Sequence, residues 1–118
     1  MNKRTTGSRY EEQAARYLET QGYRILERNF YCRQGEIDLI AREGSYLVFI
    51  EVKYRKDSLM GYPSEAVGGF KQRKLSRAAA YYCLKNRIPE TQACRFDVVS
   101  ILGEQVTLIK DAFPYALQ

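Results

Sequence analysis

The residues with the clearest chemical potential are two acids on neighbouring predicted strands, Asp38 and Glu51. The predicted strands cover residues 35–42 and 46–54, and Gly44-Ser45 between them is typical of a two-residue type II′ hairpin loop. Counting residue pairs outwards from this loop places Asp38 directly opposite Glu51. The sequence therefore predicts two carboxylates that face each other across one hairpin.

Two carboxylates at opposed positions, with Cβ atoms about 5 Å apart, destabilise a sheet. Proteins tolerate such a pair where a proton or a cation neutralises it, and Mg²⁺ favours one or two carboxylates together with water and phosphate oxygens. Lys53 lies two residues after Glu51 on the same strand face, where its ammonium can hold a phosphate oxygen. The alternative is a solvated hairpin face, on which Glu36 pairs with Lys53 as a surface ion pair.

The same alternation predicts which face of the hairpin is buried. Ile37, Leu39 and Ala41 point away from Asp38, together with the apolar residues of the second strand at 48, 50, 52 and 54. We therefore expect this face to form the core and the face with the acids to hold the site.

Composition excludes several classes of enzyme. The 118-residue chain contains no His, which excludes Ser-His-Asp and Cys-His hydrolases and His-containing zinc sites. Its three cysteines, Cys32, Cys83 and Cys94, form no CxxC pair, so we expect reduced and mostly buried thiols. Carboxylate, lysine, tyrosine and metal chemistry remain.

Positive charge is concentrated in the middle third of the chain. The net charge is +5, and residues 52–87 carry nine basic and two acidic side chains. A helix predicted within this block attracts phosphates and favours salt-dependent nucleic-acid binding, although a solvated helix face is the alternative. The candidate nucleic-acid-binding residues are Arg55, Lys71, Gln72, Arg73, Lys74 and Arg77.

Two segments carry a resemblance to a known family. Gly35-Glu36-Ile37-Asp38-Leu39-Ile40, followed by Phe49-Ile50-Glu51-Val52-Lys53-Tyr54-Arg55, resembles the PD-(D/E)XK nuclease superfamily of restriction endonucleases and archaeal Holliday-junction resolvases. More closely, nearly the whole chain resembles the small bacterial YraN family of predicted endonucleases. Ile37 stands where the strict superfamily pattern has Pro, a departure that many members share.

The resemblance implies a metal-dependent endonuclease that hydrolyses phosphodiester bonds of DNA, including branched or structured DNA. It implies that Asp38 and Glu51 are catalytic ligands of Mg²⁺ or Mn²⁺ and that the carbonyl of Val52 is a further ligand. Lys53 matches the motif lysine, which would orient the attacking water or neutralise developing charge.

Glu11 matches the acid of the first helix that completes the site, as catalytic residue and metal ligand, in resolvase-like members. A capping box with Ser8 as N-cap explains the same glutamate without catalysis. Glu11 lies three and seven residues before Ala14 and Leu18, so it borders the buried helix face, where an unpaired carboxylate is costly. Both interpretations stay open.

The flanking segments predict the elements that position these residues. We expect a single α/β domain over residues 1–118, with residues 1–7 flexible and a restriction-endonuclease-like mixed sheet of about five strands flanked by helices, in the order α-β-β-β-α-β-β. Besides the hairpin, the expected elements are a helix at 8–21, a strand at 23–30, a loop at 57–63, a helical turn at 64–67, a helix at 70–86 and strands at 93–102 and 105–109.

We expect a soluble, cytoplasmic protein without a membrane partner, because the longest apolar run, Ala78–Leu84, is too short to cross a bilayer. The expected partner is DNA, although the sequence does not distinguish DNA from RNA, and the two strands of a junction imply a homodimer by analogy. Two alternatives stay open: a non-catalytic nucleic-acid-binding module with this fold, and a protein-interaction module that uses the hairpin or residues 112–117.

Overall fold

The structure is a computed structural model that describes residues 3–55 and 67–115, with side chains from residue 9 onward. Its element order is the predicted α-β-β-β-α-β-β. The predicted loop at 57–63 and residues 64–66 of the predicted helical turn lie outside the described residues. The elements are α1 (Lys3–Thr20), β1 (Arg24–Cys32), β2 (Gly35–Glu43), β3 (Tyr46–Arg55), α2 (Gly69–Lys85), β4 (Cys94–Leu102) and β5 (Gln105–Ile109).

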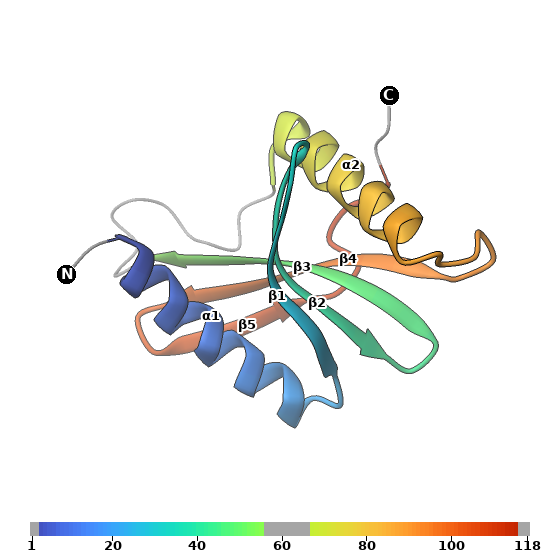
Figure 1. Ribbon diagram of the computed structural model, residues 1–118. Coiled ribbons are helices and arrows are strands. Elements are labelled where there is room, and N and C mark those ends of the chain that lie inside the picture. The colour runs from blue at the N-terminus through green and yellow to red at the C-terminus, as the bar shows by residue number, and fades with distance from the viewer. Residues whose placement is uncertain (1–2, 56–66, 116–118) are drawn as a thin grey trace.

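The strands form one five-stranded sheet in the order β1-β2-β3-β4-β5. Strands β3 and β4 are parallel and the other neighbours are antiparallel, so the predicted mixed sheet is confirmed. Helices α1 and α2 lie on opposite faces of this sheet (Figure 1). Within the described ranges, no helix is long and apolar enough to cross a membrane.

Both faces of the sheet are buried, whereas the sequence analysis predicted one core face. The α1-side cluster includes Leu18, Leu39 and Ile50, and the α2-side cluster includes Ile40 and Phe49. The hairpin face that carries the acids is therefore itself core near the loop, because α2 covers it. The site begins only where this packing ends.

Alternation along β2 fails at Ile37, which packs on the α2 side with Ile40 instead of on the α1 side with Leu39. Opposite this point, Asn29 of β1 has a φ of 51°, a left-handed conformation that Asn tolerates better than most residues. The prediction for Ile37 is therefore wrong, because strict alternation along β2 does not continue past Leu39.

Strand β1 lies at one edge of the sheet and contains a bulge. Ile25 pairs with Ala41 and Glu27 with Ile40, so Leu26 is an additional residue without an opposed partner. The bulge bends the edge strand and increases its local twist.

Helix α1 begins at Lys3, five residues before the predicted start. Ser8 therefore lies inside the helix, and the predicted N-cap is wrong. A capping-box pattern marks one possible helix start and does not exclude an earlier one. The predicted end is confirmed at Gly22, which has a φ of 91°, and the Tyr23 N–H donates to the Leu18 carbonyl. Capping consequently no longer explains Glu11, which lies in the middle of α1.

The cysteines and the C-terminal segment also test the sequence analysis. Cys32, Cys83 and Cys94 are free thiols, but Cys94 is exposed and the other two are partly exposed, so the prediction of mostly buried cysteines is wrong. The reason is that Cys94 opens β4 at the margin of the sheet. Phe113 is buried and stacks on Phe96, with ring centroids 4.8 Å apart, so this part of the C-terminal segment packs on its own domain.

Candidate active site

Asp38 and Glu51 lie at the point where β2 and β3 separate. The two strands pair from the hairpin loop as far as Leu39 and Ile50. Beyond that pair, β2 stays beside β1, and β3 continues beside β4 (Figure 1). The predicted register is confirmed up to this fork.

The predicted pairing beyond the fork is wrong. The Val52 N–H, which would bond to the backbone of β2 in a continuous ladder, donates instead to Asp38 Oδ2 at 2.8 Å. The side chain of Asp38 thus replaces a ladder bond. Glu36, which was expected opposite Lys53, pairs across the other edge of β2 with Tyr31.

The two acids nonetheless contact each other. Glu51 is 9% exposed, and its carboxyl group donates a hydrogen bond to Asp38. Burial raises the pKa of both groups, and burial together with the charge of Asp38 raises the pKa of Glu51 to about 8. The pair therefore retains a proton at neutral pH, because two ionised carboxylates at this separation are unfavourable away from water.

Two further acids complete an acidic cluster, defined here as Glu11, Glu36, Asp38 and Glu51. Carboxylate oxygens of Glu11, Glu36 and Asp38 all lie within 4.8 Å of one another. Burial, followed by the charge of Asp38, raises the pKa of Glu11 to about 7, and Asn29 donates a hydrogen bond that opposes this shift. Helix α1 thus contributes one acid, β2 two and β3 one.

The sequence analysis did not select Glu36 or Asn29 for the site. The available signal for Glu36 was its position two residues before Asp38 on the same strand, which instead favoured an ion pair with Lys53. Asn29 was not assigned a role, because its role depends on a left-handed φ and on the distance between β1 and α1.

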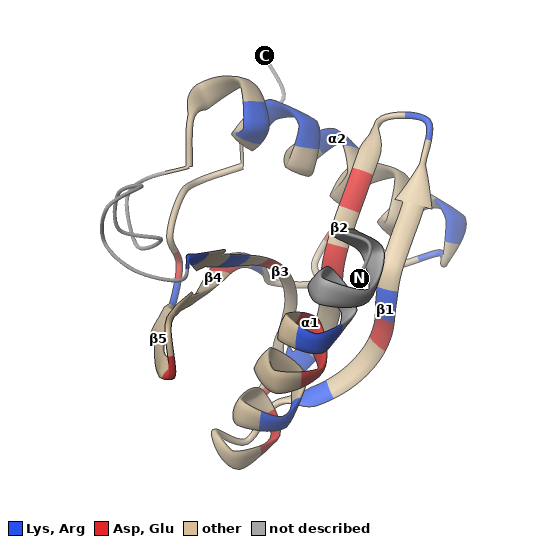
Figure 2. Cartoon of the chain, turned by 90° about the vertical axis from the view of Figure 1, so that its left-hand side faces the viewer, with Lys and Arg blue, Asp and Glu red and all other residues tan. Residues whose placement is uncertain are grey.

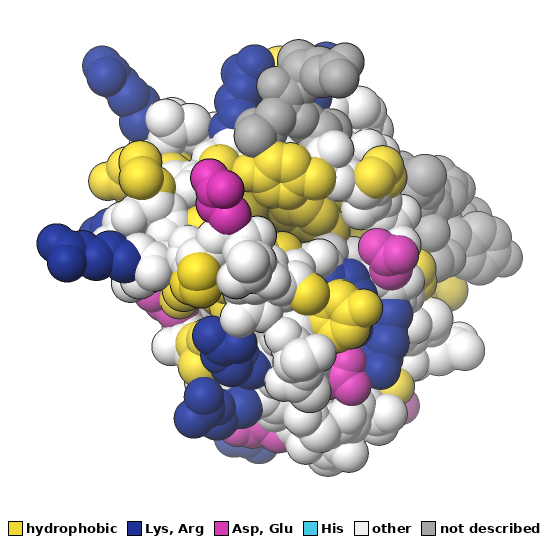
Figure 3. Space-filling view, turned by 90° about the vertical axis from the view of Figure 1, so that its right-hand side faces the viewer, with side chains coloured by type: hydrophobic (Ala, Val, Ile, Leu, Met, Phe, Trp, Pro, Cys, Tyr) yellow, Lys and Arg dark blue, Asp and Glu magenta, His cyan; other side chains and the backbone are white. Residues whose placement is uncertain are grey.

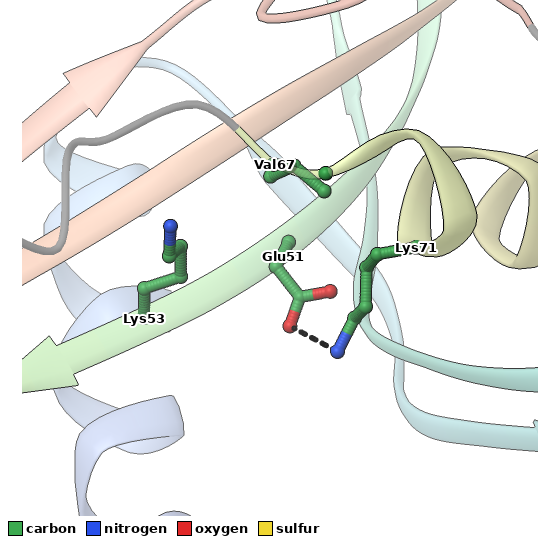
Figure 4. A pocket seen from close by; sticks show the side chains of 5 residues that line it. Glu51, Lys53, Val67 and Lys71 are labelled. Atoms are coloured by element: carbon green, nitrogen blue, oxygen red, sulfur yellow. Dashed lines mark ion pairs between the residues drawn. The ribbon is translucent and has the colours of Figure 1, made fainter.

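Lys71 reaches the cluster from the first turn of α2. Its Nζ lies 3.4 Å from Glu51 Oε1, and its side chain is 54% exposed. Figure 4 shows Glu51 between Lys53 on β3 and Lys71 on α2. These side chains border a pocket of about 210 Å³ whose lining includes Val67 and Gly68.

A second hollow of about 200 Å³ adjoins this pocket and shares Glu51 and Lys71 with it. It opens between β2 and α2, so the acidic cluster is accessible to a ligand. Figure 2 shows the acidic segments of β2 beside α1, with the basic segments of α2 above them. The other lining residues are Gly35, Glu36, Asp38, Lys74 and Leu75.

Comparison of the sequence with known proteins assigns the chain to a family. The model of the uncharacterised protein family UPF0102 matches residues 10–101. The chain belongs to UPF0102. A UPF0102 protein of Lachnoclostridium phytofermentans is 55% identical over 113 residues, which cover 96% of each chain. UPF0102 proteins of Caldicellulosiruptor saccharolyticus and Aliivibrio salmonicida are 44% and 47% identical, over 96% and 94% of this chain and 100% and 93% of theirs.

The match to UPF0102 spans the acidic cluster and α2. On α2, Arg73, Lys74 and Arg77 are exposed, opposite the buried face formed by Leu75, Ser76, Ala78, Ala79 and Tyr82. These three side chains extend positive charge away from the acidic cluster along one helix.

The other two candidate nucleic-acid-binding residues are turned toward the backbone. The side-chain amide of Gln72 donates to the Val67 carbonyl at 2.6 Å, which fixes the start of α2. The guanidinium of Arg55 donates to the Tyr54 carbonyl at 2.8 Å. The ring of Tyr54 stacks on that of Tyr10, with centroids 4.1 Å apart, so the expected packing role of Tyr54 is confirmed.

A second set of charged side chains lies away from the site. Asp97 is fully buried and accepts hydrogen bonds from Arg95 at 2.9 Å, from the Tyr23 hydroxyl at 2.6 Å and from the Asp111 N–H at 3.0 Å. Arg95 also donates to Glu43 at 2.9 Å. Arg95 and Asp97 thus form a structural ion pair, and these groups are called the Asp97 network below.

An apolar hollow of about 380 Å³ lies beside the C-terminal half of α2, on the side of the molecule that Figure 3 faces. Cys83 and Cys94 line it, and burial raises the pKa of both thiols, that of Cys83 to about 11. Thiols that stay protonated are weak nucleophiles. This hollow therefore lacks the chemistry that the acidic cluster provides.

Proposed function

We propose that this protein is a divalent-metal-dependent nuclease that hydrolyses phosphodiester bonds of DNA, including branched or structured DNA. The observation that carries the proposal is the buried pair of Asp38 and Glu51, which shares a proton in a hollow bordered by lysines. Asp38 accepts a hydrogen bond from the Val52 N–H, and Glu51 pairs with the half-exposed Lys71. Despite these partners, burial and the charge of Asp38 keep the pKa of Glu51 raised to about 8.

The residues present fit Mg²⁺ or Mn²⁺. Both ions take oxygen ligands, and the acidic cluster offers carboxylate oxygens from three elements. A cation would take the place of the proton that Glu51 donates to Asp38. We propose Asp38, Glu51 and Glu11 as ligands, with the carbonyl of Val52 as a further one. When bound, such an ion activates water and offsets negative charge on a phosphate.

The lysines supply the remaining chemistry. Lys53 lines the same pocket as Glu51, where its ammonium would neutralise charge that develops on a phosphate oxygen. Lys71 pairs with Glu51 across 3.4 Å, and a metal at Glu51 would release its ammonium to bind phosphate. Both lysines thus lie beside the carboxylates that would hold the cation.

The exposed cations of α2 support binding to a nucleic-acid backbone. Arg73, Lys74 and Arg77 share one helix with Lys71, and contacts of this kind fix the position of a nucleic acid without reading its sequence. We therefore propose a substrate defined by structure, with DNA favoured over RNA by the resemblance to DNA nucleases.

Calorimetric titration of Mg²⁺ and Mn²⁺ into the wild type and Glu51→Gln tests the metal site. We expect binding to the wild type and none to the variant. If neither ion binds, the titration is repeated with a DNA junction present, because substrate phosphate can complete such a site. Absence of binding there as well would overturn the proposal.

Cleavage of branched, flapped and single-stranded DNA in Mn²⁺ tests the activity. We expect Lys53→Ala to lower the rate about 100-fold or more while it retains metal binding, whereas Glu51→Gln loses both properties. Lys85→Ala, which removes an exposed lysine from the last turn of α2, is the matched control and should cleave normally. A wild type that binds DNA equally well in chelator and never cleaves it would instead be a non-catalytic binding module.

A further inference from the structure

Phe70 is an exposed aromatic ring next in sequence to Lys71 of the site. It is 69% exposed and lies in the first turn of α2. Lys71 projects about 100° further around the helix and pairs with Glu51. One helical turn therefore presents an apolar ring to solvent and a cation to the site.

Lys74 connects this ring to the site. Its Nζ lies 5.5 Å from the centroid of Phe70, and its side chain lines the hollow that contains Asp38 and Glu51. A cation at this distance from an aromatic face is attracted to it. The combination of a flat ring and an adjacent cation matches the two parts of a nucleotide, a base and its phosphate.

A second exposed ring borders the cluster from the β1–β2 hairpin. Tyr31 is 62% exposed, pairs across the strands with Glu36 and donates a hydrogen bond to its carboxylate. The hairpin turn and α2 are close neighbours, because a Cβ added at Gly35 would lie 3.7 Å from Lys74 Cε. Exposed rings thus occur on both elements that border the hollow.

We propose that Phe70, Tyr31 and Lys74 form a stacking patch that binds an unpaired base next to the phosphate held at the acidic cluster. Every base has a face that can stack on an aromatic ring, whereas the bases of a regular duplex already stack on each other. The patch therefore selects DNA with a single-stranded segment at the reacting phosphate, such as a flap, a gap or an opened junction. This inference rests on the proposed nuclease function and names its substrate class.

Binding of fluorescein-labelled oligonucleotides in Ca²⁺ tests the patch, with a single-stranded 20-mer and its blunt duplex as probes. We expect Phe70→Ala to weaken binding of the single strand about tenfold and to leave duplex binding within about twofold, since the phosphate-binding cations remain. Phe70→Trp should restore single-strand binding. Leu84→Ala is the matched control, because Leu84 is 79% exposed at the other end of α2.

The outcomes separate this inference from the proposed function. Unchanged single-strand binding by Phe70→Ala, or equal weakening on both probes, overturns the stacking patch. The metal titration and the cleavage assay of the wild type decide the nuclease function independently, since both use Phe70 unchanged. A wild type that does not bind the single strand overturns the stacking patch, and the nuclease function then depends on the titration and the cleavage assay alone.

Discussion

Two buried acids of this protein, Asp97 and Glu51, have opposite surroundings. Asp97 accepts hydrogen bonds from a guanidinium, a phenol and a backbone N–H. Glu51 faces Asp38, and its one described ion pair is with Lys71, whose side chain is half exposed. The Asp97 network satisfies its charge within the protein, whereas in the acidic cluster Lys71 offsets only part of the effect that burial and the charge of Asp38 have on Glu51.

This difference indicates what each region is for. Removal of one partner from a satisfied buried network is strongly destabilising. Removal of one charge from a crowded cluster of acids relieves repulsion. A region that lowers the stability of its own fold is a candidate for ligand binding, and the following changes test that contrast.

The largest effect is expected from Asp97→Asn. The neutral side chain leaves Arg95 without its buried counter-charge, so we expect a loss of about 3–5 kcal/mol in the free energy of unfolding. Asp38→Asn is the matched change in the acidic cluster and should leave that free energy unchanged or higher in metal-free buffer. Urea unfolding measures both, and a large loss for Asp38→Asn would make Asp38 a structural residue.

Metal addition should stabilise the protein through the acidic cluster and not through the Asp97 network. At a Mn²⁺ concentration 100 times the dissociation constant, the wild type should gain about 2.7 kcal/mol of stability, seen as a rise in Tm. Glu51→Gln should show no rise. Tyr23→Phe, which removes one hydroxyl from the Asp97 network, should have a lower Tm without metal and the same rise in Tm as the wild type. An equal rise in all three proteins would contradict metal binding at the acidic cluster.

In metal-free buffer, the dependence of stability on pH should distinguish the acidic cluster from the Asp97 network. Because the pKa of Glu51 is raised to about 8, its contribution to stability is present below its ordinary pKa of 4.5 and is lost as pH rises through 8. Glu11, with a pKa of about 7, acts in the same direction. At pH 9, Glu51→Gln should therefore be more stable than the wild type, and at pH 5 the two should be nearly equally stable.

Urea unfolding at pH 5, 7 and 9 in chelator measures this difference. Glu90→Gln removes an exposed glutamate remote from the cluster and should follow the wild-type profile. If the free energy of unfolding changes with pH in the same way for the wild type and Glu51→Gln, ionisation of Glu51 does not destabilise the fold, and the prediction is wrong.

The smallest effect is expected from Lys71→Ala. A half-exposed ion pair contributes about 0.5 kcal/mol, so the metal-free protein should lose about that much at pH 9, where Glu51 is ionised. Its affinity for Mn²⁺ should rise about two- to fivefold, because the ammonium no longer competes for Glu51. Calorimetry measures this, with Lys85→Ala in the last turn of α2 as the control. A weaker affinity would mean that Lys71 supports the metal site.

The elements and the inner hairpin were predictable because their signals are local. Gly44 has a φ of 60°, as its predicted place in the loop requires, and apolar alternation fixes the register next to it. The fork at Leu39 and Ile50 was not predictable, because beyond it β3 continues only beside β4. Strand β4 lies far from the hairpin in sequence.

The same limit applies to the site. Asp38, Glu51 and Lys53 could be selected because they share one hairpin. The structure adds Glu36, because α1 and β2 pack together and bring its carboxylate close to that of Glu11. It adds Lys71 to the cluster, because α2 packs against β3 and brings its ammonium close to Glu51. Sequence spacing within a strand predicts a shared face, but contacts between elements depend on how the elements pack.

The bulge at Leu26 has a consequence for assembly. An open sheet edge offers unpaired N–H and C=O groups to another strand. On β1 the additional residue bends that edge, and exposed charged side chains at Arg24, Glu27 and Arg28 flank it. A strand from a second copy would have to straighten the bulge and desolvate these charges. A dimer of this chain would therefore associate through another surface. The bulge and the charges also disfavour the addition of further strands at β1, which would lead to aggregation.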